Sequence, residues 1–115
     1  MKYPIANGAE LIAVERQRQI DTEGWTPEHD AEHTAGELAG AARAYARFAQ
    51  MQVCKQKISV NPPLSWPDWD EEWWKPSPEP IRNLVKAGAL IAAEIDRLQH
   101  IPASDVEALM RPEEK

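Results

Sequence analysis

The feature that most constrains the fold is a helical repeat of apolar residues near the end of the chain. Apolar side chains recur there at spacings of three and four residues, at Ile81, Leu84, Val85, Gly88, Ile91, Ala92, Ile95 and Leu98. This spacing places them on one stripe of an α-helix. The pattern predicts a helix over about residues 79–99 with this stripe as its apolar face.

Three further helices are predicted by their start and stop signals. Residues 8–22 combine apolar positions with a run of strong helix formers, and Gly24 ends that helix. Thr26 and Pro27 then predict the start of a second helix that runs to about residue 50. Ser104 and Glu107 form a capping box for a short final helix. The expected fold is all-α, with three main helices.

A proline-rich and tryptophan-rich loop is predicted over about residues 51–78. Its prolines exclude a regular element between residues 61 and 80, yet the stretch carries four tryptophans, at Trp66, Trp69, Trp73 and Trp74. A loop this long in a small protein is usually functional or packed by its own side chains. Two interpretations stay open, a cap over an undersized core and the wall of a pocket.

Length and composition restrict the class of protein. With 115 residues the chain is long enough for one domain, and we expect flexible tails at residues 1–7 and 111–115. No apolar run is long enough to span a membrane, no secretory signal is evident, and the single Cys54 cannot form an internal disulfide, which together favour a cytoplasmic location. The net charge of −6 argues against direct binding to nucleic acid.

Acidic residues and a histidine suggest a site for a divalent cation such as Mg²⁺. Asp30, His33 and Glu37 share one stripe of the second predicted helix, and Glu15 and Glu94 flank the apolar faces of two other helices. Carboxylates from facing helices are a common way to hold a metal ion in a helical bundle. The alternative is an ordinary solvated helix start, where the helix dipole favours acidic residues.

Basic and aromatic residues suggest a second kind of site. Four basic side chains are candidates to meet a phosphate, at Arg16, Lys75, Arg82 and Lys86. Three tryptophans are candidates to stack on a base, at Trp25, Trp69 and Trp73. The alternative is that the basic residues are solvated surface groups. No nucleophile motif or phosphate-binding glycine loop is present in the sequence.

The chain resembles a family of small proteins found in phages, prophages and bacteria. The resemblance spans about residues 9–99 and rests on these segments: Glu15-Arg-Gln-Arg-Gln-Ile20, Gly24-Trp-Thr-Pro-Glu-His-Asp30, His33, Gly36-Glu-Leu38, Trp66-Pro-x-Trp69, Trp74-Lys-Pro76, Leu84 to Ile91 and Glu94 to Leu98. It implies a protein of a bacterial host cell and no particular reaction.

The chain is also similar to the MazG-type all-α nucleoside triphosphate pyrophosphohydrolases. Those enzymes are small helical proteins that hold magnesium with carboxylates on facing helices. Their Glu-x-x-Glu and Glu-x-x-Asp patterns are absent here, since Glu28 and Glu32 are four residues apart and Glu94 and Asp96 are two apart. No site residue is implied by this similarity.

Two functions remain as hypotheses from the sequence. The first is a phage-type accessory protein that binds a nucleotide or related phosphorylated ligand, with or without a divalent metal; as an enzyme it would hydrolyse a phosphoanhydride with metal assistance. The second is a non-catalytic acidic protein that inhibits a host defence complex, which the charge of −6 favours. A homodimer is compatible with either hypothesis.

Overall fold

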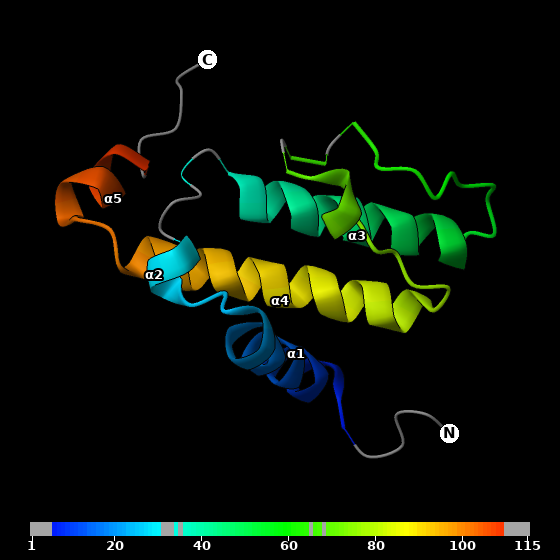
Figure 1. Ribbon diagram of the computed structural model, residues 1–115, viewed down its shortest axis with the longest axis horizontal. Coiled ribbons are helices and arrows are strands. Elements are labelled where there is room, and N and C mark those ends of the chain that lie inside the picture. Colours follow the sequence, from blue (N-terminus) through cyan, green and yellow to red (C-terminus); the bar gives the residue numbers. More distant parts are fainter. Residues whose placement is uncertain (1–5, 31–33, 35, 65, 68, 110–115) are drawn as a thin grey trace.

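The computed structural model describes residues 6–30, 34, 36–64, 66–67 and 69–109, and these residues form helices and no strand. The elements are α1 (Gly8–Glu23), α2 (Pro27–Asp30), α3 (Glu37–Val53), the short 3-10 helix η1 (Glu71–Trp73), α4 (Pro80–Gln99) and α5 (Ala103–Leu109) (Figure 1). The all-α class predicted from the sequence is confirmed. None of the described helices is long and apolar enough to cross a membrane.

Helix α4 lies at the centre of the molecule. Helices α3 and α4 run side by side in opposite directions, and α1 crosses α4 on the side away from α3 (Figure 1). Both α1 and α2 contact α4. Because α4 contacts each of the other long helices, its side chains can reach elements on both sides of it.

Both ends of α1 are capped. The Asn7 side chain accepts a hydrogen bond from the Glu10 backbone N–H at 2.9 Å, so this residue of the predicted tail is the N-cap of the helix. At the other end Gly24 has φ +72°, a left-handed conformation that a glycine adopts without strain. The Trp25 N–H then donates to the Gln19 carbonyl at 3.1 Å, which turns Trp25 back toward α1. The second predicted tail, residues 111–115, and residues 1–5 lie outside the described residues.

The single helix predicted over residues 27–50 is wrong, because the described residues form two helices there. Thr26 caps α2 as expected, with its hydroxyl accepting from the His29 N–H at 3.2 Å. Gly36 has φ +79° and stands just before α3, and this left-handed conformation is incompatible with a continuous helix. The break leaves α3 free to run antiparallel to α4.

The core forms between α3 and α4 and is covered by tryptophans of the loop, of which Trp74 is buried and Trp66 and Trp69 are partly buried. One face of α3 is buried, at Leu38, Ala41, Ala42, Tyr45, Phe48 and Ala49. Small residues on α4 let the two helices approach closely, since Ala87, Ala89 and Ala93 are at most 3% exposed. Trp74 packs on this core, with its ring centroid 4.7 Å from that of Tyr45. The loop tryptophans therefore complete the core in part.

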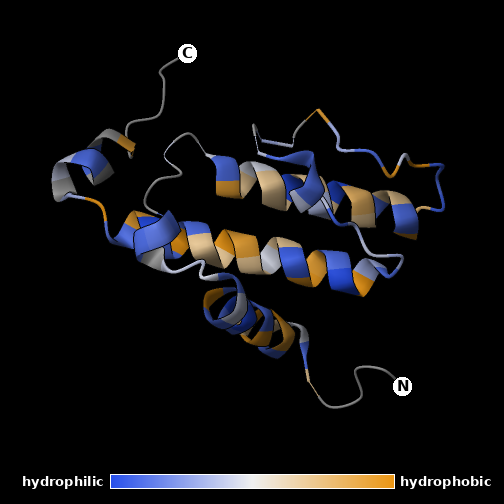
Figure 2. Ribbon diagram, viewed as in Figure 1, coloured by the Kyte–Doolittle hydropathy of each residue, from blue (hydrophilic) through white to orange (hydrophobic). Residues whose placement is uncertain are grey.

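The apolar stripe of α4 faces the core less than its pattern suggests. Figure 2 shows apolar residues repeated along the whole length of α4. Yet Ile81, Leu84, Ile91 and Ile95 are each about half exposed. The buried face instead contains small residues with Asn83 and Arg97, because close packing against α3 and α1 selects side-chain size and hydrogen bonding there.

The loop is shorter than predicted and is tied to both neighbouring helices. Helix α3 continues to Val53, and η1 interrupts the loop at Glu71–Trp73. The buried Asn83 amide donates to the Gln52 side chain and to the Ser77 carbonyl, both at 2.8 Å, and its oxygen accepts from the Ser77 N–H. These bonds fix the end of the loop against α3 and α4, so the residues that precede it are held over α3.

Candidate functional site

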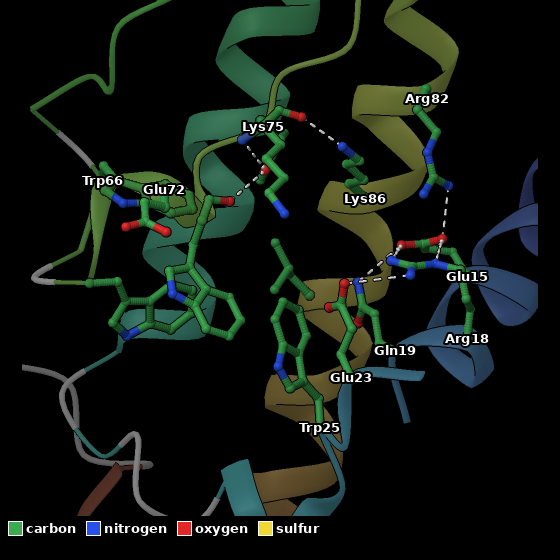
Figure 3. Close-up of a pocket in the computed structure, with 14 residues that line it drawn as sticks. Glu15, Arg18, Gln19, Glu23, Trp25, Trp66, Glu72, Lys75, Arg82 and Lys86 are labelled. Atoms are coloured by element: carbon green, nitrogen blue, oxygen red, sulfur yellow. Dashed lines mark hydrogen bonds and ion pairs between the residues drawn. The ribbon is translucent and has the colours of Figure 1, made fainter. Parts of the chain in front are cut away.

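A cleft of about 690 Å³ opens between α1, α4 and the tryptophan-rich loop (Figure 3). Six of the seven predicted ligand-binding residues line it: Trp25, Trp69, Trp73, Lys75, Arg82 and Lys86. In Figure 3, Lys75, Lys86 and Arg82 lie toward one end of the cleft and Trp25 toward the other. The structure thus brings together basic and aromatic residues that are up to 61 positions apart in the sequence, from Trp25 to Lys86.

A buried carboxylate organises the basic end. Glu15 is 3% exposed, and its two carboxylate oxygens accept hydrogen bonds from Arg18 Nε at 2.9 Å and Arg18 Nη2 at 2.8 Å. Arg82 Nη1 donates to the same carboxylate at 2.8 Å. One acidic residue of α1 therefore holds two guanidinium groups, one from its own helix and one from α4, at the edge of the cleft.

These bonds change the pKa of the groups involved. Burial alone would raise the pKa of Glu15, but the hydrogen bonds from Arg18 and Arg82 outweigh it and leave the pKa below its ordinary value. The hydrogen bonds to Glu15 raise the pKa of Arg18 in turn. Glu15 is therefore ionised at neutral pH and works as the fixed counter-ion of the two arginines.

Two lysines and a tyrosine complete the basic end. Lys86 Nζ donates to the Lys75 carbonyl at 2.6 Å and lies 5.3 Å from the centroid of the Tyr45 ring. The Tyr45 hydroxyl accepts from the Lys75 N–H at 3.0 Å and donates to the Trp73 carbonyl at 3.3 Å. Burial lowers the pKa of Lys86, and the positive charge of Arg82 lowers it further. An anion placed here would relieve that repulsion.

The aromatic end is formed by indole rings from two distant segments. Trp25 and Trp73 are stacked with centroids 5.7 Å apart and an angle of 26° between the rings. Trp73 is 50% exposed, whereas Trp74 beside it is buried and donates from its indole N–H to the Val60 carbonyl at 2.9 Å. The loop tryptophans were interpreted either as a cap over the core or as the wall of a pocket. Trp74 covers the core, whereas Trp73 lines the cleft.

Two polar atoms at the cleft have no hydrogen-bond partner within the described part of the chain. They are Gln19 Oε1 and Trp66 Nε1, and both belong to residues that line the cleft. The other end of the Gln19 amide donates to Glu15 at 3.4 Å, which fixes the orientation of that amide. One unsatisfied acceptor and one unsatisfied donor therefore adjoin the site, whereas buried polar groups are usually hydrogen-bonded.

Arg16 does not line the cleft, although the sequence predicts that it binds a ligand. It is 7% exposed and donates to the Trp25 carbonyl at 2.8 Å, to Asp30 at 3.4 Å and to Asp96 at 3.3 Å. These bonds connect α1 with α2 and α4. Arg16 positions the segment that carries Trp25 and has a structural task.

Three of the five predicted metal ligands, Glu15, Asp30 and Glu94, are paired with arginines in this structure. Glu15 pairs with Arg18 and Arg82, Asp30 pairs with Arg16, and Glu94 pairs with Arg97 at 2.6 Å. No group of three or more metal-binding side chains occurs among the residues that the structure describes. His33 lies outside the described residues.

Arg97 forms an ion pair with Glu94 and is also influenced by the charges of Glu37 and Asp30. Hydrogen bonding to Glu94 raises the pKa of Arg97, and the charges of Glu94, Glu37 and Asp30 raise it further. Arg97 is 7% exposed and stands in α4, where the apolar repeat does not indicate a buried cation. These three carboxylates are therefore close enough to act on one guanidinium group.

Several residues of the cleft were not predicted from the sequence. Arg18, Gln19, Glu23, Tyr45, Trp66, Glu72 and Leu90 also line it. Arg18 and Gln19 stand three and four residues after Glu15, a spacing that indicates a shared helix face. Comparisons of this chain with protein-family models, with curated proteins and with solved structures found no match. What the cleft could bind has therefore to be inferred from the chemistry of its lining.

Proposed function

We propose that this protein is a phage-type accessory protein whose cleft binds a nucleotide or a related phosphorylated aromatic molecule. The observation that carries the proposal is a cluster of basic side chains and a set of partly exposed indole rings around one cleft. The chain as a whole has a net charge of −6. Four basic residues gathered in one concave site concentrate positive charge on an otherwise acidic protein, which favours an anionic ligand there.

Each end of the cleft suits one part of such a ligand. Arg82, Lys75 and Lys86 offer the charge-assisted donors that phosphate oxygens accept. Trp25 and Trp73 offer flat apolar faces, and stacking of a base on an aromatic side chain contributes about 1–3 kcal/mol. The volume of about 690 Å³ lies within the range of sites for small molecules.

The proposal is limited to binding. Metal-assisted hydrolysis needs carboxylates free to hold the ion, and Glu15 at the cleft is engaged by Arg18 and Arg82. Glu23 and Glu72 also line the cleft, but Glu23 lies 3.5 Å from Arg18 and Glu72 lies across the cleft from Arg82 (Figure 3). The described residues therefore give hydrolysis no specific support.

Calorimetric titration with the common ribonucleosides and their mono- and triphosphates tests this function. We expect heat of binding from at least one nucleotide, and weaker binding in Trp73→Ala and Arg82→Ala. Arg43→Ala is the matched control, because Arg43 is an exposed cation of α3 that does not line the cleft. A folded sample that binds no nucleotide, or cleft variants that bind like the control, would contradict the proposal.

The competing function is an acidic interaction protein that inhibits a host defence complex. It is supported by the charge of −6 and by the half-exposed stripe of Ile81, Leu84, Ile91 and Ile95 on α4. Capture of a defined host complex that Ile91→Asp abolishes, and that Trp73→Ala leaves unchanged, would favour this function. Nucleotide binding with the opposite response of the two variants would favour the cleft.

A further inference from the structure

The charges of the cleft restrict the phosphate group that it fits. Four cations line the cleft, at Arg18, Lys75, Arg82 and Lys86. Glu15 lies between Arg18 and Arg82 at 2.8 Å from each. Glu23 lies 3.5 Å from Arg18. Glu72 also lines the cleft, so three carboxylates offset three of the four positive charges and about one positive charge remains for a ligand.

The remaining charge is concentrated at one place. Arg82 uses one of its terminal nitrogens for Glu15, and Lys86 lies on the same helix one turn further along. The Lys86 ammonium is held over Tyr45 by its bond to the Lys75 carbonyl, so its charge stays at the cleft. The third acidic residue, Glu72, lies near Trp66 and across the cleft from Arg82 (Figure 3).

We infer that the phosphate end of the cleft takes one phosphomonoester dianion without a metal ion, so that the ligand class is the nucleoside monophosphates. The inference rests on the proposed function of the cleft. A phosphomonoester carries a charge of about −1.5 to −2 at neutral pH, which the residual positive charge and the donors of Lys75, Arg82 and Lys86 balance better than the larger charge of a triphosphate. A triphosphate brings further negative charge that would need a divalent cation.

The available ligand atoms agree with a metal-free site. Mg²⁺ bound beside a phosphate chain usually takes one or two protein carboxylates as ligands. Glu15 already accepts hydrogen bonds from Arg18, Arg82 and Gln19. In the part of the chain that the structure describes, carboxylates and imidazoles do not gather into a metal-binding group. The cations of the cleft therefore neutralise the single phosphate group of the ligand in place of a metal ion.

The test compares ligands that differ only in their phosphate groups. Calorimetry of the whole chain is carried out with adenosine, AMP and ATP, and with the guanosine, cytidine and uridine series, each with and without Mg²⁺. We expect the monophosphate of the preferred base to bind at least about tenfold more tightly than its nucleoside, and more tightly than the triphosphate in either condition. Mg²⁺ should leave the monophosphate affinity unchanged.

Two variants check where the phosphate lies. Lys75→Gln removes a cation from the cleft while its backbone bonds to Tyr45 and Lys86 remain possible, and Lys57→Gln is the control at an exposed lysine outside the cleft. We expect Lys75→Gln to weaken monophosphate binding by about tenfold and to leave nucleoside binding unchanged. Lys57→Gln should change neither. An equal loss for monophosphate and nucleoside would overturn the inference.

The outcomes separate the inference from the function on which it rests. Tightest binding of a triphosphate with Mg²⁺ would overturn the inference and leave the proposed function in place. Silence of all the nucleosides and nucleotides with folded protein would remove both. Binding of a nucleoside as tight as that of its monophosphate would overturn the inference as well, because it would show that the cations of the cleft do not hold the phosphate.

Discussion

At the scale of single residues, the structure depends on carboxylates that are matched to guanidinium groups. Glu15 is the clearest case, because it is buried and holds Arg18 from α1 and Arg82 from α4 at the same time. The cost of burying this charge is offset only while both partners are in place. Glu15 therefore links the stability of the α1–α4 contact to the geometry of the cleft.

Replacing Glu15 tests this link through the pH dependence of stability. The folded-state pKa of Glu15 is lowered, so its contribution is present above the ordinary glutamate pKa and is lost as the pH falls through the folded-state pKa. We expect Glu15→Gln to lower the free energy of unfolding at neutral pH by about 1–3 kcal/mol. The variant should then lose less stability than the wild type as the pH falls below the glutamate range.

Urea unfolding at a series of pH values provides the measurement. Glu10→Gln is the control, since Glu10 is an exposed carboxylate on the same helix. We expect the control to stay within about 0.5 kcal/mol of the wild type. Parallel pH profiles for Glu15→Gln and the wild type would contradict the role assigned to Glu15.

At the scale of helices, the crossing of α1 and α4 decides whether the cleft exists. A Cβ atom at Gly88 of α4 would lie 2.7 Å from Ile12 Cγ1 and closer still to Ile12 Cδ1. Only a glycine lets Ile12 sit so close to the α4 backbone. This contact sets the approach of α1, which in turn brings Glu15 within reach of Arg82.

A double-mutant cycle at this crossing measures the contact. Gly88→Ala should destabilise the protein while Ile12 is present, because the new methyl group forces the Ile12 side chain out of place. In an Ile12→Ala background the same change should stabilise the protein, since alanine is the better helix former by about 1 kcal/mol. We expect a coupling energy of about 1–3 kcal/mol from urea unfolding of the four proteins. Additive effects would show that the two residues do not meet.

Helices with strong local signals could be predicted from the sequence, and features set by distant contacts could not. The start of α1, its end at Gly24 and the extent of α4 are encoded by capping and periodicity. The break before α3 could not be predicted in this way, because glycine also occurs inside continuous helices. The left-handed φ of Gly36 depends on the surrounding fold. The half-exposed stripe of α4 was also missed, since periodicity does not tell which neighbour covers a face.

The candidate site also combines features that could be predicted from the sequence with features that depend on distant contacts. Residue types alone suggested basic and aromatic ligand-binding residues, and six of those seven residues line one cleft. The partners of the acidic residues were not predictable, because Arg82 is 67 positions from Glu15 and reaches it only through the α1–α4 crossing. The burial of Arg97 could not be predicted either, because this residue lies within the apolar repeat of α4.

At the scale of the whole molecule, an acidic protein carries a cleft where basic and aromatic residues meet. The proposed ligand site involves some of the tryptophans and not others. Trp25 and Trp73 line the cleft, whereas the Trp74 indole N–H is bonded to the Val60 carbonyl and its ring is buried in the core. Among the five tryptophans of the chain, Trp25 and Trp73 can therefore report ligand binding, and Trp74 serves as an internal control.

The most direct test is an NMR titration of the five indole N–H signals of ¹⁵N-labelled protein with a nucleoside monophosphate. The signals are assigned by single Trp→Phe variants. We predict that the Trp25 and Trp73 signals shift with a common saturation curve, and that the Trp74 signal stays in place. Shifts centred on Trp74, or no shift of Trp25 and Trp73 with any of the four monophosphates, would contradict the assignment of the cleft as the ligand site.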